Sequence, residues 1–222
     1  MSNVGRFSKL VAAAAVAGIF SVGSAAAATC SSAQSGATSS SGLDTSNVTV
    51  TWIGGSNVAT VEATSCAGLY SGNDTGAQGT LLGNLNNGMF GGDLASGWSL
   101  YGKSDDNPSI VYADQDEKTG SWSVDFSPWM YSVFSVTLKG GTGYATYLFD
   151  FRPLESWDFG GGFDMAGVIN KGGQIAELSH LTIATWGTPT PIPLPATGWL
   201  MLSVLGLGGL VAHRKRKQKM AA

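Results

Sequence analysis

Acidic side chains in two polar stretches are the first residues that could carry chemistry. Residues 105–107 (Asp-Asp-Asn) and 114–117 (Asp-Gln-Asp-Glu) bring together the oxygen ligands that a Ca²⁺ site requires. Neither stretch has the spacing of an EF-hand loop, which places a glycine at its centre and a glutamate at its end. Acidic turns are common on solvated surfaces. We therefore expect two solvated loops, and no metal ion or other cofactor.

His180 is the only histidine away from the chain ends, because the second, His213, belongs to the basic C-terminus. A zinc site or a Ser-His-Asp triad would need partners that sequence spacing does not reveal. A lone histidine in a strand-like stretch is more often structural. Paired carboxylates for glycoside hydrolysis stay open, since the distance between two of the 15 acidic residues cannot be taken from a sequence. We name no catalytic residue and expect the protein not to be an enzyme.

Aromatic side chains offer a second chemistry, the stacking of sugar rings. Trp98, Trp122 and Trp129 are the candidates, because an indole ring suits the CH-rich face of a pyranose. Tyr101, Tyr131 and Trp157 could extend such a face. In β-sandwich proteins, however, large aromatics more often lie in the core. The sequence favours the core interpretation and leaves the glycan-stacking one open.

Alternation of apolar and polar residues predicts the elements that position these side chains. Strands are expected at residues 47–53, 58–64, 98–103, 121–126, 133–139, 144–151 and 178–186. Within 133–139, Phe134, Val136 and Leu138 should share one face, with Ser135, Thr137 and Lys139 on the other. The stretch 70–92 is dense in Gly and Asn and should form loops. Without a clear amphipathic helix, this pattern predicts an all-β fold: an antiparallel β-sandwich or jelly-roll-like ectodomain over residues 47–187.

Composition supports one glycine-rich β-domain with an acidic surface. The 222 residues include 32 glycines, and only 12% are charged. Between the two ends of the chain, five basic residues stand against all fifteen acidic ones, a net charge of −10. Such a domain repels phosphate backbones, so nucleic acid is not an expected partner.

The N-terminus has the pattern of a secretory signal peptide over residues 1–28. Arg6 and Lys9 supply the positive region, residues 10–20 the apolar region and residues 24–28 the small residues for cleavage after Ala28. A flexible Ser/Thr/Gly-rich lead-in is expected over 29–46. Export would place Cys30 and Cys66, the only two cysteines, in an oxidising compartment. A disulfide between them is then favoured over two free thiols.

The C-terminus combines three further segments. A Pro-rich linker over 188–195 contains the sorting motif discussed below, and an apolar transmembrane helix is expected over 196–213. The basic tail, 214–222, opens with a stop-transfer cluster formed by Arg214, Lys215, Arg216 and Lys217. Positive residues stay on the cytoplasmic side, so the domain should lie outside the cytoplasm on an inner-membrane-anchored precursor.

The tail resembles the VPLPA-type variant of the PEP-CTERM sorting signals of Gram-negative bacteria. The resemblance rests on Ile192-Pro193-Leu194-Pro195-Ala196, which departs from the pattern only at Ile192, together with the apolar span and the basic end. It implies that an exosortase, an integral-membrane transpeptidase, recognises Pro193, Leu194, Pro195, Ala196 and Thr197 and cuts nearby. It also implies a cell-surface or extracellular-matrix protein, often associated with exopolysaccharide.

The same residues fit a second sorting motif. Leu194-Pro195-Ala196-Thr197-Gly198 matches the LPxTG motif of Gram-positive sortase substrates, in which Thr197 would be joined to the cell wall. Trp199 follows directly, where such motifs usually lead into a polar residue, so the exosortase interpretation is favoured. The expected function is an exported, non-enzymatic surface or matrix protein. The alternatives are a carbohydrate-binding module, an LPxTG wall protein and, least favoured, a polysaccharide hydrolase.

Overall fold

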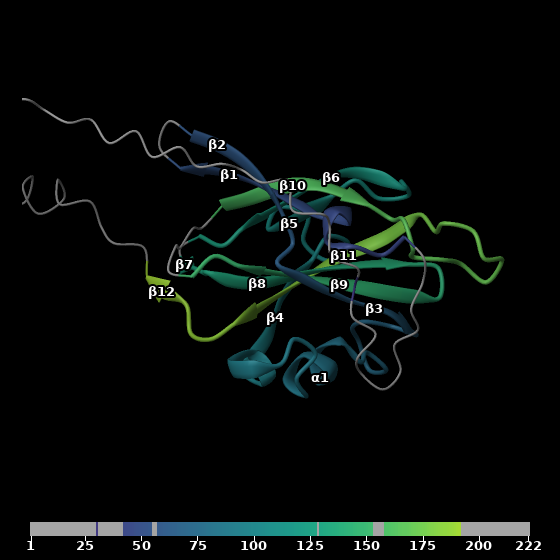
Figure 1. The fold of residues 1–222 in the computed structure, drawn as a ribbon, viewed down its shortest axis with the longest axis horizontal. Helices are drawn as coiled ribbons and strands as arrows, with labels where there is room; N and C mark the ends of the chain where they lie inside the picture. Colours follow the sequence, from purple (N-terminus) through teal and green to yellow (C-terminus); the bar gives the residue numbers. More distant parts are fainter. Residues whose placement is uncertain (1–29, 31–41, 55–56, 128, 153–157, 192–222) are drawn as a thin grey trace, which may run out of the picture.

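The computed structural model describes Cys30 and residues 42–54, 57–127, 129–152 and 158–191 (Figure 1). The predicted signal peptide, Trp157, the sorting motif, the predicted transmembrane helix and the basic tail lie outside the described residues. In the described part of the chain, no helix is long and apolar enough to span a membrane.

Two five-stranded antiparallel sheets form the body of the molecule, which confirms an all-β fold. The first, called here the open sheet, has the order β2 (Asn57–Glu62), β1 (Thr49–Gly54), β10 (Asp158–Asp164), β6 (Thr119–Asp125) and β5 (Val111–Ala113). The second, the covered sheet, has the order β3 (Ser65–Ser71), β9 (Gly143–Asp150), β8 (Val133–Gly140), β11 (Leu178–Trp186) and β4 (Trp98–Lys103). The two sheets lie face to face (Figure 1).

The main core fills the space between the sheets. Trp122 and Phe159 of the open sheet meet Phe134 and Phe149 of the covered sheet, with ring centroids 4.8–6.4 Å apart. As predicted, Phe134, Val136 and Leu138 all point into this core, because successive residues of a strand face opposite sides of its sheet. Burial of these rings supplies much of the driving force for joining the sheets.

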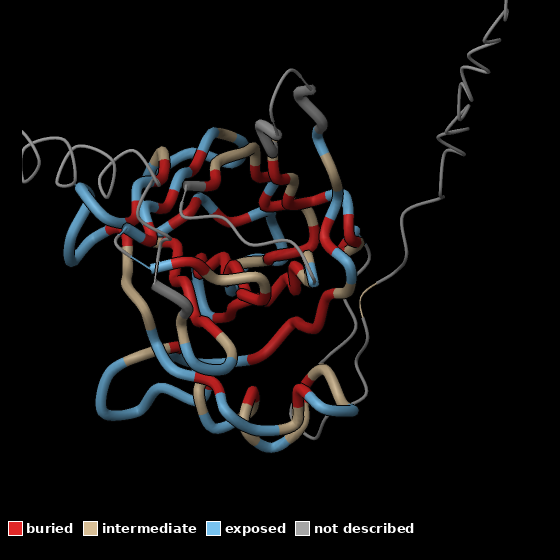
Figure 2. The backbone as a smooth tube through the Cα atoms, turned by 90° about the vertical axis from the view of Figure 1, so that its left-hand side faces the viewer, coloured by how far each residue is buried: buried red, intermediate tan, exposed pale blue. Residues whose placement is uncertain are grey.

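A third layer lies on the outer face of the covered sheet. Residues 72–97, called here the covering segment, contain α1 (Leu81–Asn86) and the short 3-10 helix η2 (Gly92–Ala95). Leu81, Leu85 and Leu94 of this segment form a second core with Trp98, Tyr144 and neighbouring residues of the covered sheet. Figure 2 shows buried residues gathered in the interior of the molecule and exposed residues along its outer loops.

The covering segment is attached to the sheet by side-chain amides as well as by apolar contact. Asn86 of α1 donates to the Trp98 carbonyl and accepts from the Trp98 amide, at 3.1 and 2.9 Å. Asn84 donates to the Tyr144 hydroxyl at 2.9 Å. Residues 70–92, which were expected to form loops with little regular structure, also contain the end of β3 and the six-residue helix α1. Two buried leucines in a six-residue helix are too few to give a periodic signal.

The expected disulfide is present. Cys30 and Cys66 are joined with their Cα atoms 4.6 Å apart. The Cys30 amide also donates to the Leu43 carbonyl at 3.1 Å. The bond therefore ties the start of the lead-in to β3 of the covered sheet. A short 3-10 helix, η1 (Thr45–Asn47), then leads into β1 and is capped by Asp44, whose carboxylate accepts from the Ser46 amide.

A two-stranded ribbon holds the start of the predicted linker. Strand β12 (Thr190–Pro191) pairs with β7 (Trp129–Met130), so Pro191 lies opposite Trp129. Proline fits here because the ribbon has only two strands and needs few amide donors. This pairing attaches the chain to the domain as far as Pro191.

Candidate functional site

Polar side chains occupy the buried outer face of the covered sheet. The register places Thr137 between Thr146 and Thr182, and Lys139 between Tyr144 and His180. The three threonines are fully buried, and Lys139 is 6% exposed. A buried polar group needs a hydrogen-bond partner. The Thr137 and Thr146 hydroxyls supply one to each other at 3.1 Å, and the partners of Thr182 and Lys139 are described below.

Asp74 is the centre of this polar layer. It belongs to the covering segment, and only 2% of its surface is exposed. One carboxylate oxygen lies 2.9 Å from Nε2 of His180, and the other accepts a 2.6 Å hydrogen bond from the Thr182 hydroxyl. We call these three residues the latch, because they fasten the covering segment to β11. Burial raises the pKa of Asp74, but the hydrogen bonds from His180 and Thr182 outweigh it and hold the pKa below its ordinary value.

The opposite side of His180 faces a second carboxylate. Its Nδ1 lies 3.7 Å from an Asp105 oxygen, and Asp105 in turn lies 3.2 Å from Nζ of Lys103. Acidic and basic side chains therefore alternate in a row from the buried layer to the surface, in the order Asp74, His180, Asp105 and Lys103. With a carboxylate at each ring nitrogen, His180 is placed to hold two loops together.

Lys139 closes the polar layer on the β8 side. Its Nζ donates to the Gly141 carbonyl at 3.0 Å. Burial lowers the pKa of Lys139, and the charge of Asp74 partly opposes that effect. The cation and the Asp74 carboxylate thus offset one another within the same layer, which reduces the cost of burying each charge.

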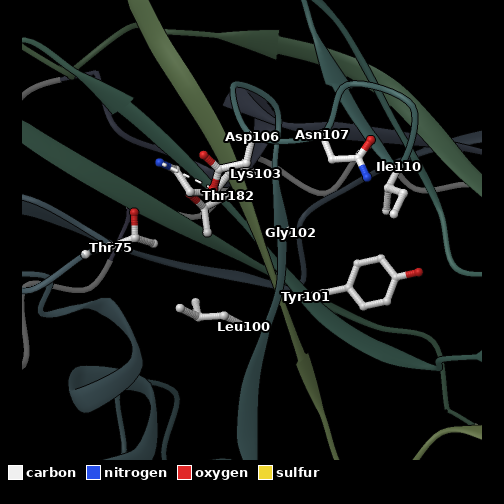
Figure 3. A pocket seen from close by; sticks show the side chains of 10 residues that line it. Thr75, Leu100, Tyr101, Gly102, Lys103, Asp106, Asn107, Ile110 and Thr182 are labelled. Atoms are coloured by element: carbon white, nitrogen blue, oxygen red, sulfur yellow. Dashed lines mark ion pairs between the residues drawn. The ribbon is translucent and has the colours of Figure 1, made fainter.

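A groove of about 620 Å³ lies next to the latch. It follows β4, the last strand of the covered sheet, and Figure 3 shows the lining side chains on both sides of that strand. The lining residues are Thr75, Gly76, Leu100, Tyr101, Gly102, Lys103, Asp106, Asn107, Ile110 and Thr182. Thr182 belongs to both the latch and the groove, and Thr75 directly follows Asp74. The latch therefore sets the position of one wall of the groove.

Tyr101 is held rigidly on the opposite side of β4. A bulge at this point of the strand separates Leu100, which lies opposite Ala184, from Gly102, which lies opposite Ile183. The extra residue, Tyr101, turns its ring against Phe126 and Tyr131, at centroid distances of 4.8 and 5.8 Å. Its hydroxyl donates to the Asp125 carbonyl at 2.7 Å.

The latch does not have the geometry of a catalytic triad. A triad needs a histidine whose one nitrogen is free to take a proton from a nucleophile. In the latch both oxygens of Asp74 and the Nε2 of His180 are engaged, and Nδ1 faces Asp105. The groove offers apolar contact from Leu100 and Ile110 beside charged and amide groups from Lys103, Asp106 and Asn107.

The tryptophan candidates for glycan stacking are separated by the fold. Trp98 is 4% exposed, and its ring nitrogen donates to the Leu94 carbonyl in the second core. Trp122 is 2% exposed and lies between the sheets. Both rings are enclosed by protein, so the glycan-stacking role suggested for them is wrong. Trp129, on β7, is 41% exposed and keeps an available surface.

The acidic stretches also have defined partners. Asp105 pairs with Lys103, while Asp114 accepts hydrogen bonds from the Tyr112 hydroxyl and the Ser121 amide. Within residues 42–54, 57–127, 129–152 and 158–191, no three His, Cys, Asp or Glu side chains converge as a metal site would require. Asp105 and Asp114 therefore interact with donors of the chain itself.

The sequence did not point to Asp74, Thr182 or Lys139, nor to the groove. One signal was present, since Ser135, Thr137 and Lys139 were expected on one face of their strand. The structure shows that this polar face is buried beneath the covering segment. That could be deduced only by knowing that a distant loop returns to cover it.

Comparison of the chain with family models, with curated proteins and with solved structures gave no match.

Proposed function

We propose that this chain is an exported cell-surface or extracellular-matrix protein whose domain acts by binding and not by catalysis. The observation that carries the export part is the Cys30–Cys66 disulfide. Disulfides persist in oxidising compartments and are rare in the reducing cytosol. The bond begins two residues after the predicted cleavage site at Ala28, so it would form at the very start of the mature chain.

The binding part of the proposal is supported by how the charged groups are used. Asp74 and His180 fasten a loop, as described above, and Lys139 donates to a carbonyl. Glycoside hydrolysis needs two carboxylates across one cleft. Among the described residues that line the groove, Asp106 is the single carboxylate. A polysaccharide hydrolase is therefore less well supported than a binding domain.

The C-terminal part of the proposal depends on the sequence resemblance. We propose that an exosortase-type membrane transpeptidase processes the chain at Pro193 to Thr197, while the helix at 196–213 holds the precursor in the membrane. These residues lie outside the described part. The ribbon of β7 and β12 supports the proposal indirectly, because it fixes the chain to the domain up to Pro191 and leaves the motif directly after this attachment.

Intact-mass analysis of the exported protein tests both parts. The full chain would be produced in a Gram-negative host that has an exosortase and in the same host without it. We expect a mature N-terminus at Thr29, cysteines that react with an alkylating agent only after reduction, and a C-terminus within 193–197 that depends on the exosortase. A Pro193→Ala, Pro195→Ala double variant should block C-terminal processing, and Pro189→Ala serves as the control.

The outcomes separate the alternatives. A mature protein that still carries Arg214 to Lys219 would exclude both sorting mechanisms. A C-terminus at Thr197 joined to cell-wall peptide would instead support the LPxTG interpretation. Free thiols at Cys30 and Cys66 in the isolated protein would contradict export.

A further inference from the structure

The groove along β4 presents two kinds of contact on a rigid frame. Leu100 and Ile110 are 44% and 38% exposed, and they line the groove together with Tyr101. Polar groups of Asp106, Asn107 and Lys103 lie at one end, as Figure 3 shows. A ligand that fits must combine apolar CH surface with closely spaced hydrogen-bonding groups.

The charge of the groove restricts the ligand further. Lys103 lies 3.2 Å from Asp105 and 4.0 Å from Asp106, so its charge is already balanced by carboxylates of the chain. The region between the two chain ends carries a net charge of −10. An anionic ligand would be repelled by that charge and would find no unopposed cation in this lining. The groove therefore favours an uncharged ligand.

The shape favours a chain over a single small molecule. The groove lies along an outer strand of the sheet, so the sheet itself closes only one side. Its volume of about 620 Å³ falls within the range of roughly 300–1,000 Å³ typical of ligand sites. The latch holds Thr75 and Gly76 on one side, and the packed ring of Tyr101 holds the other, so little ordering is required when a ligand binds.

We propose that this groove binds a segment of a neutral polysaccharide, whose sugar CH faces contact Leu100, Tyr101 and Ile110 while its hydroxyls bond to Asp106, Asn107 and Lys103. Sugars present this combination of apolar faces and dense hydroxyl groups. The inference rests on the proposed binding role of the domain, and it does not depend on how the C-terminus is processed.

An extended peptide that adds a strand to β4 fits less well. Such pairing needs a regular edge with available backbone groups. Here the bulge at Tyr101 interrupts the edge, and the Lys103 carbonyl already accepts from the Asn107 amide at 3.1 Å. The backbone amide and carbonyl of Trp98 are already hydrogen-bonded to the side chain of Asn86. Bulges and edge lysines are features that block strand addition.

Affinity electrophoresis of the exported, disulfide-bonded full chain tests the proposal. The probes are three neutral polysaccharides (dextran, laminarin and galactomannan) and one acidic polysaccharide, alginate. We expect at least one neutral polysaccharide to retard the protein, with retardation that is unchanged between low and high salt. A Leu100→Ala, Ile110→Ala double variant and, separately, Asp106→Ala should each weaken binding about tenfold.

Matched controls use exposed residues outside the groove. Ile175 is 44% exposed and Glu177 is also exposed, so Ile175→Ala and Glu177→Gln should change affinity less than about twofold. Circular dichroism establishes that each variant is folded.

Three results would each overturn the inference: binding to none of the neutral polysaccharides, binding that the groove variants leave unchanged, and salt-sensitive binding to alginate alone. Capture of an extended peptide that competes at β4 would also overturn it. The mass analysis above would still decide export and processing independently.

Discussion

The carboxylate of Asp74 lies 2.9 Å from Nε2 of His180, although 106 residues separate the two in the chain. Asp74 follows β3, an outer strand of the covered sheet, and His180 lies on β11, on the far side of β9 and β8. The pair therefore reaches across the sheet and fixes the covering segment that lies on it. Because Thr182 binds the same carboxylate and lines the groove, this contact connects the stability of the third layer to the shape of the groove.

Removing the Asp74 carboxylate should destabilise the domain. Asp74→Ala leaves His180 and Thr182 without their buried partner, and hydrogen bonds to charged groups contribute about 1.5–3 kcal/mol each. We expect a loss of roughly 3 kcal/mol in the free energy of unfolding, measured by denaturant titration with tryptophan fluorescence. Glu177→Gln is the control, because Glu177 is exposed, and it should change the value by less than about 0.5 kcal/mol. An equal loss in both variants would contradict the role of the latch.

The latch should also weaken in acid. The pKa of Asp74 is lowered in the folded protein from its ordinary value of 3.8, so the ionised form is the one that folding favours. Its contribution is fully present above that value and is lost as the pH falls through the lower pKa of the folded state. The difference in unfolding free energy between the native protein and Asp74→Asn should be constant near pH 5 and shrink below about pH 4. A difference that grows on acidification would show the opposite sign of linkage.

Reduction of the disulfide should destabilise the protein, because the unfolded chain gains conformational entropy when the bond is broken. Cys30 and Cys66 are 36 residues apart, and closing a loop of this length is worth about 4 kcal/mol in the chain-entropy model. A reductant should lower the unfolding midpoint of the native protein and leave a Cys30→Ser, Cys66→Ser variant unaffected. If both proteins responded alike, the bond would have no role in stability.

Two tryptophans that look equivalent in the sequence should behave differently. Trp122 is 2% exposed and its ring nitrogen donates to the Thr49 carbonyl at 3.2 Å, so Trp122→Ala should cost about 3–5 kcal/mol. Trp129 is 41% exposed, and Trp129→Ala should cost about 1 kcal/mol or less. Thermal unfolding of the two variants under identical conditions provides the comparison. Similar midpoints would mean that the core does not lie where the structure places it.

Neighbouring glycines of β10 should also differ. A Cβ at Gly161 would lie 1.8 Å from the Thr49 carbonyl oxygen, whereas one at Gly162 would lie 3.4 Å from the Thr49 hydroxyl. Gly161→Ala should therefore force β1 and β10 apart and cost about 3 kcal/mol or more, while Gly162→Ala should be tolerated. Denaturant titration measures both. Equal tolerance would contradict the close approach of the two strands.

Local patterns determined a large part of this fold. Alternation predicted β4 and β11 with the same bounds that the structure shows. The same alternation assigned Phe134, Val136 and Leu138 to the core. The cysteine pair was also predictable, because the leader indicated an oxidising compartment and left a single pairing.

Tertiary structure decided the rest, because those features depend on partners far apart in sequence. Gly160, Gly161 and Gly162 have low strand propensity, yet they form β10 because β1 and β6 pair with it on its two sides. Glycine is required at position 161 because β1 comes too close there for a side chain. The burial of Trp98 beside Leu94 followed from the return of the covering segment over the sheet. Asp74 and His180 became partners for the same reason, since sheet order and register, not spacing along the chain, set which side chains meet.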